Sequence, residues 1–558
     1  SAAPIIFFWH WGLCFVINIP DPKYLEIMNK SAIKKIFQNN NRNFYFLLLI
    51  TFIFILFSHP FLKYPYDMWR DLVFIDDVYR INKVVYKREL WYLFWADVFH
   101  LSSIEDFFIR ARIIHIVQTA ICLFSVFFFS RVLIRNIFKD INNIHLNYLS
   151  YWSALVWLTI YATFSMVTHQ VWVMWYSINY QIALAFFWYI TALTLILVVE
   201  EKAWPIKLFY CTQIVLFSYI MLSIHPMELV YYFMYLFLIG IVFFDKIIHF
   251  IRVKYCVVLP VLFVGIASQY IFFTYYFKYK DRLPPIIKII KNDGLTTLYE
   301  VVIKNGLDLI SGLNRSFASI NELMIVIFFI GLVLSVDIIR RHLLKKVYKI
   351  NIRLLIFTII STLFVVIPLF QFSAGLASVI FFNEVVHRIY YSSSLYVLLP
   401  VGVYYFLINY NHKVSLSKIN ISIISIVIVT TLYSRFFSES HNYYKNVMSL
   451  VDSYDQRKVG FQLSPDNIKT IGVLLNNYER EIPKNGKSII YFARSDISFV
   501  LKYIYKRDVY QKLSWNGQNN LKTFKQFADY SKDPKVLKTK IPFIFRIPPS
   551  FPRYIPYS

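Results

Sequence analysis

No charged residue interrupts residues 180–199, which read YQIALAFFWYITALTLILVV. A helix needs about 20 mostly apolar residues to cross the hydrocarbon core of a bilayer, so this stretch is long enough to span it. Similar apolar runs occur at 44–62, 107–130, 148–167, 206–224, 229–244, 255–277, 322–338, 352–370, 389–408 and 419–436. We therefore predict an α-helical polytopic membrane protein with about 11 transmembrane helices.

The composition of the chain agrees with this fold class. Hydrophobic residues make up 58% of the 558 residues, charged residues make up only 16%, and the mean hydropathy is +0.52. Soluble domains carry a larger share of charged residues. Cys14, Cys122, Cys211 and Cys256 lie in or beside apolar runs. Neither a disulfide framework nor a cysteine metal cluster is therefore indicated.

The chain is strongly basic, with 58 Lys and Arg against 32 Asp and Glu and a net charge of +26. In a soluble protein this excess would suggest nucleic-acid binding. Here much of it lies in short loops between spans, where basic residues set membrane topology and meet anionic lipid. We therefore expect membrane lipid as a partner and no nucleic acid.

The basic residues follow the alternation of the spans. The relevant residues are Lys30, Lys34, Lys35, Arg42, Arg131, Arg135, Lys139, Lys246, Arg252, Lys254 and the cluster Arg340–Arg353. All of them share one side if the spans alternate, and the positive-inside rule makes that side cytoplasmic. We expect an integral protein of a bacterial inner (plasma) membrane, with its N-terminus in the cytoplasm and its C-terminus outside. The basic loop 278–321 falls outside as an exception, where it could bind an anionic ligand.

Three parts follow from this organisation. Residues 1–43 form a cytoplasmic N-terminal segment, within which the basic lead after Met28 indicates Met28 as the natural start. Residues 44–436 form the transmembrane domain, with long outward loops at 59–106 and 278–321. Residues 437–558 are polar; we expect a strand at 488–492 and a helix at 496–506 there, in a small extracytoplasmic α/β domain.

The first outward loop, residues 59–106, is rich in carboxylates and aromatic residues. Apolar residues recur in it at helical spacing: Met68, Leu72, Ile75, Val78, Tyr79, Leu90, Leu93, Phe94 and Val98. We therefore predict two amphipathic helices on the membrane surface, with their Trp and Tyr side chains at headgroup depth.

Three carboxylates of this loop are candidates for catalysis. Asp67 is the first carboxylate after the first span, and Arg70 lies near enough to keep it ionised. An ionised carboxylate can act as a general base that takes the proton of an acceptor hydroxyl. Asp76 and Asp77 are the alternative base, and this neighbouring pair could hold a divalent cation such as Mg or Mn. Surface salt bridges would explain all three equally well.

Histidine and glutamate also occur in two short outward links. His225 and Glu228 are three residues apart across a helix junction broken by proline, so both can face one side. Together with His169 they could bind a metal ion or orient a substrate. A helix cap or a buried hydrogen bond is an equally good interpretation.

The link before the tenth span contains Glu384, His387 and Arg388. Arg388 would lie at the depth of lipid phosphates, and the forked donors of guanidinium match a phosphate group. Anchoring of the helix in the membrane by a snorkelling arginine is the alternative interpretation.

These features together resemble the GT-C superfamily of membrane glycosyltransferases, which use sugars linked to polyprenyl phosphate. The resemblance is architectural and covers most of the chain from Met28. It implies a base in the first outward loop, which maps to Asp67, while Asp76 and Asp77 resemble the family's alternative paired-acid pattern. The usual Asp-Glu pair directly after the first span is absent. The resemblance also implies an inverting transfer to a glycan, lipid or protein acceptor, and a basic contact to the donor phosphate, such as Arg388 or a lysine of loop 278–321.

Other functions remain open at this point. A lipid-linked glycan polymerase or ligase would also have many spans, but it would rely on Arg and His of a late loop. A transporter would show repeated halves, spans broken by Gly or Pro, and charges near the bilayer midplane. The chain has only 13 Gly and few charges within its spans, which argues against transport. A non-enzymatic membrane scaffold is the remaining alternative.

Overall fold

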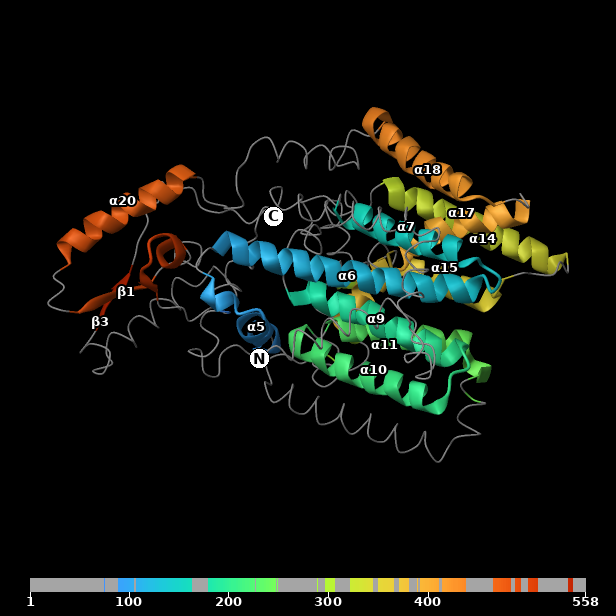
Figure 1. Ribbon diagram of the computed structural model, residues 1–558, viewed down its shortest axis with the longest axis horizontal. Helices are drawn as coiled ribbons and strands as arrows, with labels where there is room; N and C mark the ends of the chain where they lie inside the picture. The colour runs from blue at the N-terminus through green and yellow to red at the C-terminus, as the bar shows by residue number, and fades with distance from the viewer. Residues whose placement is uncertain are drawn as a thin grey trace, which may run out of the picture. The chain divides into compact units, whose positions relative to one another are not determined.

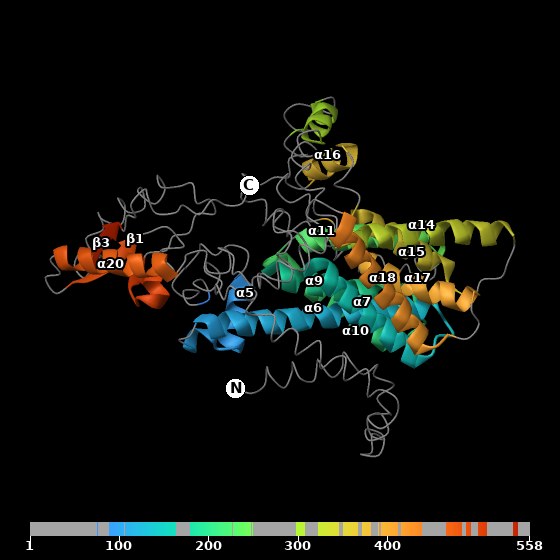
Figure 2. The ribbon, with the colours of Figure 1, turned by 90° about the horizontal axis from the view of Figure 1, so that it is seen from above.

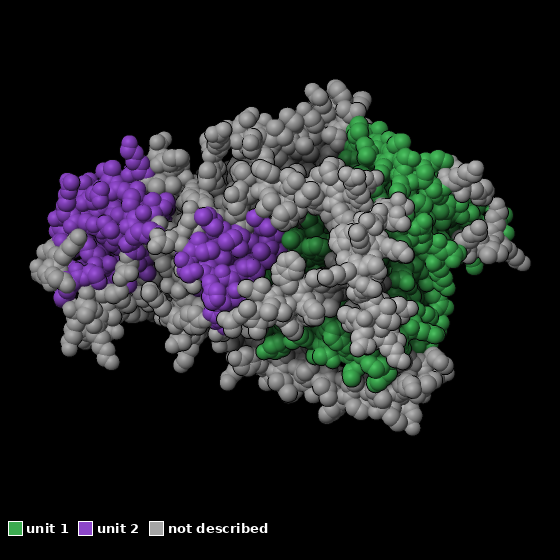
Figure 3. Space-filling view, in the orientation of Figure 1, with its two compact units in different colours: residues 1–54, 118–174, 179–449 green, residues 55–117, 175–178, 450–558 purple. Residues whose placement is uncertain are grey.

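The computed structural model of the chain is shown in Figure 1. It describes residues 75, 89–104, 107–162, 179–225, 227–246, 248, 289, 297–306, 322–344, 350–365, 371–380, 389, 392–410, 414–437, 465–482, 487–492, 500–509 and 540–544. These residues are mostly helical. The chain divides into two compact units, coloured separately in Figure 3: unit 1 comprises 1–54, 118–174 and 179–449, and unit 2 comprises 55–117, 175–178 and 450–558.

Apolar helices dominate the described part of unit 1. They are α6 (Phe107–Ile137, whose first residues belong to unit 2), α7 (Asn143–Ala162), α9 (Asn179–Val199), α10 (Trp204–Ile224), α11 (Met227–Val242), α14 (Glu322–Leu343), α15 (Ile352–Thr362), α17 (Leu395–Tyr410) and α18 (Leu416–Phe437). Within the described residues, four segments are long and apolar enough to cross a bilayer: Ile116–Ile137, Gln181–Val199, Trp204–Ile224 and Leu323–Leu343. Shorter apolar helices accompany them. The protein is therefore a helical, membrane-embedded protein.

Each predicted apolar span that falls within the described residues is helical in the structure. α9 covers residues 179–199, against a prediction of 180–199. One span is shorter than predicted, because α15 ends at Thr362 and a 3₁₀ turn, η8 (Leu363–Val365), follows it where the apolar run continues to 370. The predicted spans at 44–62 and 255–277 lie outside the described residues.

Hydrogen bonds between helices fix their relative directions. Thr119 in the middle of α6 bonds Gln181 near the start of α9, and Asn136 bonds Glu200 where the same two helices end, so α6 and α9 run parallel. Figure 1 shows α9 beside α6, with α10 and α11 next to it. Since α7 separates α6 from α9 in the chain, these helices alternate in direction, as consecutive membrane spans must.

α14 and α17 are parallel for the same reason. Asp337 accepts a hydrogen bond from Tyr405, and Arg341 donates to Asn409, so matched positions lie 68 residues apart in both contacts. Gly402 on α17 makes room for a side chain of α14, since an added Cβ on Gly402 would lie 2.5 Å from Cγ2 of Ile330. Small residues allow such close packing in membrane helices, where burial from water contributes little to association.

The alternation separates two ends of unit 1. The "basic end" is where α6, α9, α11, α14 and α17 finish, and it carries the interhelical contacts Arg131–Asn147, Asn136–Glu200, Asp245–Arg353 and Arg341–Asn409. The "loop end" is where α9, α11, α14 and α17 begin. The basic residues that the sequence assigns to the cytoplasmic side therefore gather at one end of the bundle, wherever the structure describes them.

The described segment of the first loop corrects one prediction. Helix α5 (Glu89–Leu93) runs into a π-helical turn, η3 (Phe94–Val98), and a 3₁₀ turn, η4 (Leu101–Ser103), follows. Trp91 and Trp95 are only 2% and 1% exposed, so these rings pack inside the protein instead of facing lipid headgroups. Their edge-to-face contact, with ring centroids 6.2 Å apart, belongs to an aromatic cluster with Phe94 and Phe99. The earlier of the two predicted helices lies outside the described residues except for Ile75.

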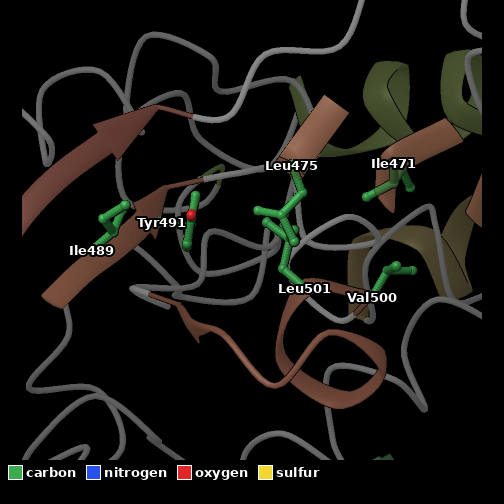
Figure 4. Packing of buried hydrophobic residues seen from close by; sticks show 6 residues of the cluster. All are labelled: Ile471, Leu475, Ile489, Tyr491, Val500 and Leu501. Carbon is green, nitrogen blue, oxygen red and sulfur yellow. The ribbon is translucent and has the colours of Figure 1, made fainter. Parts of the chain in front are cut away.

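A small parallel sheet forms near the C-terminus, with helix α20 (Pro465–Glu481) against it. Strand β1 (Ser488–Phe492) lies between β2 (Asp508–Val509) and β3 (Lys540–Ile544), and it occupies the residues that the sequence predicts as a strand. Of the predicted helix at 496–506, the described residues form a π-helical turn, η11 (Val500–Ile504). Figure 4 shows the core, which consists of Ile471, Leu475, Ile489, Tyr491, Val500 and Leu501.

A buried polar contact supports this core. Glu479 of α20 accepts hydrogen bonds from Tyr491 of β1 and from both Nε and Nη2 of Arg507, at 2.6–2.9 Å. Burial, together with the Glu479 carboxylate, raises the pKa of Tyr491. The bidentate contact ties the helix to the chain that enters β2.

Candidate functional site

Two of the predicted site residues, His225 and Glu228, fall within the part of the chain that the structure describes. The others lie outside it: Asp67, Arg70, Asp76, Asp77, His169, Glu384, His387 and Arg388. The structure therefore brings together one predicted pair.

His225 ends α10 and Glu228 lies in the first turn of α11, at the loop end. His225 has extended backbone dihedrals, and its backbone N–H donates to the carbonyl of Met221. The proline at position 226 suits this change of direction, because the residue before a proline is biased away from helical dihedrals. The junction therefore turns the chain and brings the two side chains to the same side, as their spacing predicts.

Nδ1 of His225 lies 2.5 Å from Oε2 of Glu228. An ionised carboxylate only accepts, so opposite it Nδ1 is the donor of this hydrogen bond. The side chains are only 15% and 4% exposed, and Glu228 lies at the positive end of the α11 dipole. A carboxylate that fixes the tautomer and orientation of an imidazole in this way is an arrangement used in both catalytic and metal sites. A role as a buried structural hydrogen bond has the same geometry.

A second group of buried polar side chains consists of hydroxyls, which sequence analysis did not single out. We call it the hydroxyl cluster: Tyr235 of α11, Thr358, Ser361 and Thr362 of α15, and Ser392, Ser393 and Ser394 before α17. All are at most 2% exposed. Ser393 donates to the carbonyl of Thr362, the hydroxyls of Ser361 and Ser394 are in contact, and Tyr235 Oη donates to the carbonyl of Ser392 at 2.5 Å.

The hydroxyl cluster joins the ends of two short helices. α15 has 11 residues and α17 has 16, and 11 residues span about 16 Å, roughly half the thickness of the hydrocarbon core. Backbone that leaves a helix at membrane depth needs hydrogen-bond partners from the protein or from a hydrated cavity. The hydroxyls meet that need within the protein. The run of three serines near the start of the predicted span 389–408 was the available sequence signal.

Two segments assigned to the outward side contact each other at a short helix pair. Residues 297–306, from the long basic loop, pack against α16 (Gln371–Ile380), as Figure 2 shows. Gly375 faces the carbonyl of Val302 and Gly306 faces the carbonyl of Gln371, so a Cβ at either glycine would clash with backbone. Asn305 also donates to Ser378 at 3.2 Å. The loop 278–321 and the link that precedes α17 are thereby tied to one another.

No group of three or more His, Cys, Asp or Glu side chains is positioned to hold a metal ion among the described residues. The predicted cation ligands Asp76 and Asp77, and His169, lie outside that part of the chain. His225 and Glu228 alone supply two potential ligands, one fewer than the three protein ligands typical of a catalytic zinc site.

Comparison with known proteins adds no assignment. No family model matches the chain, and no curated protein matches it either. The functional argument therefore depends on the residues and their geometry.

Proposed function

We propose that the protein is a membrane glycosyltransferase of GT-C type, which moves a sugar from a polyprenyl-phosphate donor to a glycan, lipid or protein acceptor on the extracytoplasmic side. The observation that carries this proposal is the difference between the ends of unit 1. At the basic end Arg131, Arg341 and Arg353 are held in contacts with neighbouring segments, whereas the buried His225–Glu228 pair and the hydroxyl cluster lie toward the loop end.

In this proposal the first loop supplies the chemistry. Asp67 accepts the proton of the acceptor hydroxyl as that oxygen attacks the anomeric carbon, and the polyprenyl phosphate leaves from the opposite face, so the configuration inverts. Asp76 and Asp77 are the alternative base or the ligands of a divalent cation. In the chain this loop directly precedes α6.

In this proposal Arg388 binds the donor phosphate. Glu384 and His387, which lie close to Arg388 in the sequence, and Arg70 of the first outward loop are the further residues assigned to substrate binding. The bidentate donors of arginine match two oxygens of a phosphate, which a lysine cannot do. His225, Glu228 and His169 are assigned to the acceptor, where the oriented imidazole can hydrogen-bond a sugar hydroxyl.

The finer architecture belongs to the same proposal. The bundle would contain about 11 spans, with the apolar runs at 44–62 and 255–277 as two of them. The N-terminus would lie in the cytoplasm of a bacterium, and residues 437–558 would form an extracytoplasmic α/β domain, to which the sheet and α20 contribute. The contacts that place the basic residues of several helices at one end support this orientation.

The experiment is a transfer assay on the purified protein with a radiolabelled polyprenyl-phosphate sugar, with and without EDTA. Transfer to added acceptor lipids or glycans, with release of polyprenyl phosphate, is the expected result. Loss of transfer in EDTA, restored by Mg²⁺ or Mn²⁺, would assign the cation to the reaction. Polymerisation of a preformed lipid-linked glycan, without use of a monosaccharide donor, would favour the polymerase or ligase alternative. Absence of both reactions, together with uptake in vesicles, would favour a transporter.

A further inference from the structure

A short pair of helices in unit 1 stands apart from the spans. It consists of α16 and the helical residues 297–306, which meet at Gly375 and Gly306. A Cβ at Gly375 would lie 1.9 Å from the carbonyl oxygen of Val302, so the pair is closely packed. Figure 2 shows α16 off the side of the bundle, nearer to the loop end than to the basic end. The pair therefore lies beside the spans and not among them.

One side of α16 exposes large apolar side chains. Phe372 is 55% exposed and Leu376 is 38% exposed, whereas Ala374 and Ala377 are buried. Phe372 and Leu376 are four residues apart, so they lie on the same side of the helix. The sequence of α16 contains no charged residue. A helix side of this kind is more stable against hydrocarbon than in water.

The other helix of the pair carries charged groups. Glu300 and Lys304 are exposed and four residues apart, so they also share one side of their helix. Tyr299 of this helix is 64% exposed. Tyrosine is enriched where a membrane meets water, because its ring is apolar and its hydroxyl is polar. Together the two helices present an apolar side, a charged side and an exposed tyrosine, as helices at a membrane surface do.

The spans next to this pair are in contact with lipid. The span α14 carries Phe329, Leu332 and Val336, which are 58–61% exposed. Exposed apolar side chains in the middle of a membrane span face the acyl chains of the lipid. In Figure 2 α14 lies on the side of the bundle nearer to α16. The exposed side of α16 therefore continues a surface that lipid already covers.

We infer that the pair formed by α16 and residues 297–306 lies in the surface of the bilayer at the loop end, where Phe372 and Leu376 contact lipid acyl chains and Lys304 stays in water. This contact does not depend on the proposed enzymatic function. Helices of this kind bury their apolar side about 5–10 Å into the boundary between headgroups and acyl chains. Since residues 297–306 belong to the long basic loop, the contact holds part of that loop at the membrane surface.

The test measures how lipids and water quench a fluorescent label on the pair. The full chain, with its four native cysteines replaced by alanine, receives one new cysteine at a time: Phe372→Cys, Leu376→Cys, Lys304→Cys or Leu332→Cys. These side chains are all exposed, so the fluorophore NBD can be attached without displacing packed groups. Each labelled protein is reconstituted into nanodiscs whose lipids carry a nitroxide either near the headgroup or near the end of the acyl chain. Iodide is the quencher in water.

The three quenchers should separate three environments. The labels of Phe372→Cys and Leu376→Cys should lose most of their emission to the shallow nitroxide, and less to the deep nitroxide or to iodide. Lys304→Cys on the same helix pair is the control for water, and iodide should quench it most. Leu332→Cys in the middle of α14 is the control for the hydrocarbon core, and the deep nitroxide should quench it most.

Each of the other outcomes overturns the inference. If Phe372→Cys and Leu376→Cys respond to the quenchers as Lys304→Cys does, the pair lies in water. If they respond as Leu332→Cys does, α16 enters the hydrocarbon core and its surface position is wrong. Protection of both labels from iodide and from both nitroxides would show that protein, and not lipid, covers this side of α16.

Discussion

The two ends of the helix bundle use different chemistry to join their helices. At the basic end, charged groups connect neighbouring helices, as in the contacts of Arg341 on α14 with Asn409 on α17 and of Asp337 on α14 with Tyr405 on α17. Toward the loop end, neutral hydroxyls and backbone carbonyls do so, as in the contacts of Tyr235 with Ser392 and of Ser393 with Thr362. Both kinds of contact can stabilise helix packing in a membrane, but they leave different groups available for a ligand.

The difference indicates that the two ends of the bundle have different roles. Arg131, Arg341 and Arg353 at the basic end already have hydrogen-bond partners, so a ligand would have to compete with those contacts to use them. Hydroxyls toward the loop end satisfy the backbone of two short helices without using charged groups. If this is correct, changes at the basic end should affect stability and changes in the outward loops should affect turnover.

The largest effect is expected from Asp67. Asp67→Asn keeps the size of the side chain and removes the proton acceptor, so sugar transfer should fall by about 100- to 10,000-fold while the protein still inserts and binds its donor. The measurement is initial transfer rate at saturating donor, with donor binding recorded separately. Asp71→Asn, four residues along the same loop, is the control for a general loss of local charge.

The paired acids provide the competing outcome. If Asp67→Asn transfers normally and Asp76→Asn combined with Asp77→Asn abolishes transfer, the base lies at the pair. If all of these variants are active, the carboxylates of the loop are structural. The assignment of catalysis to the outward loops is then wrong.

The next largest effect is expected at the basic end. Arg341→Ala removes the guanidinium whose Nε lies 2.7 Å from Oδ2 of Asp337, a carboxylate that is 7% exposed. Breaking a buried ion pair from one side costs about 3–5 kcal/mol, and the 19% exposure of the Arg341 side chain favours the lower value, about 3 kcal/mol. Unfolding in mixed detergent micelles measures this loss, and the surviving folded protein should transfer sugar at the normal rate.

An exposed ion pair at the same end is the control. The side chains of Arg353 and Asp245 are 50% and 61% exposed, so Arg353→Ala should leave stability unchanged, because solvated pairs contribute little. A variant of Arg341 that folds normally but no longer transfers sugar would show that the basic end takes part in the reaction. It would contradict the assignment of that end to stability alone.

A smaller effect is expected where α14 and α17 approach each other. An added Cβ at Gly402 would lie 2.5 Å from Ile330 and 3.4 Å from Leu334, so Gly402→Ala should destabilise by about 1–3 kcal/mol through overpacking. Gly240 of α11 has no neighbouring atom within 4 Å of the same position, and Gly240→Ala should instead stabilise by about 0.5–1 kcal/mol through helix propensity. Equal melting temperatures for the two variants would contradict the close packing of α14 on α17.

Sequence patterns predicted helices and strands best where one element determines its own structure. The uncharged run of α9 and the strand β1 have the predicted positions, because length and periodicity are local properties. The prediction that Trp91 and Trp95 lie at headgroup depth was wrong, because their burial depends on packing with other parts of the protein, which helical spacing alone does not show. The early end of α15 was also missed, since it depends on serines more than thirty residues further along the chain.

The same distinction applies to the candidate site. His225 and Glu228 could be predicted to meet because they are three residues apart at a break marked by proline. Tyr235 could not be connected to Ser392 in advance, because their contact requires α11 and α17 to be packed together. Residues that act through distant partners leave no spacing in a single sequence.

The smallest effect tests whether a single partly buried carboxylate at the basic end is structural. Glu200 accepts from Asn136 at 3.0 Å and lies 2.9 Å from Nζ of Lys202. Partial burial alone would raise the pKa of Glu200, but the contacts with Lys202 and Asn136 outweigh it and hold the pKa below its ordinary value of 4.5. A carboxylate whose pKa is lower in the folded state stabilises the fold above its unfolded pKa, and this contribution is lost as the pH falls through the folded pKa.

Glu200→Gln should therefore lower the melting temperature slightly at pH 7, and the difference from wild type should shrink as the pH falls below about 4.5, where the unfolded chain also takes up the proton. Thermal unfolding in detergent at pH 7, 5 and 4 measures it, with Glu201→Gln as the control, because Glu201 is its exposed neighbour. If the difference in melting temperature grows as the pH falls, the ionised carboxylate destabilises the fold. Glu200 would then belong with the groups kept for function and not with those that join helices. A difference in melting temperature that does not change with pH would assign the effect of Glu200→Gln to packing. The amide and the carboxylate have equal size and differ in charge only where the carboxylate is ionised, so an effect of charge would change with pH.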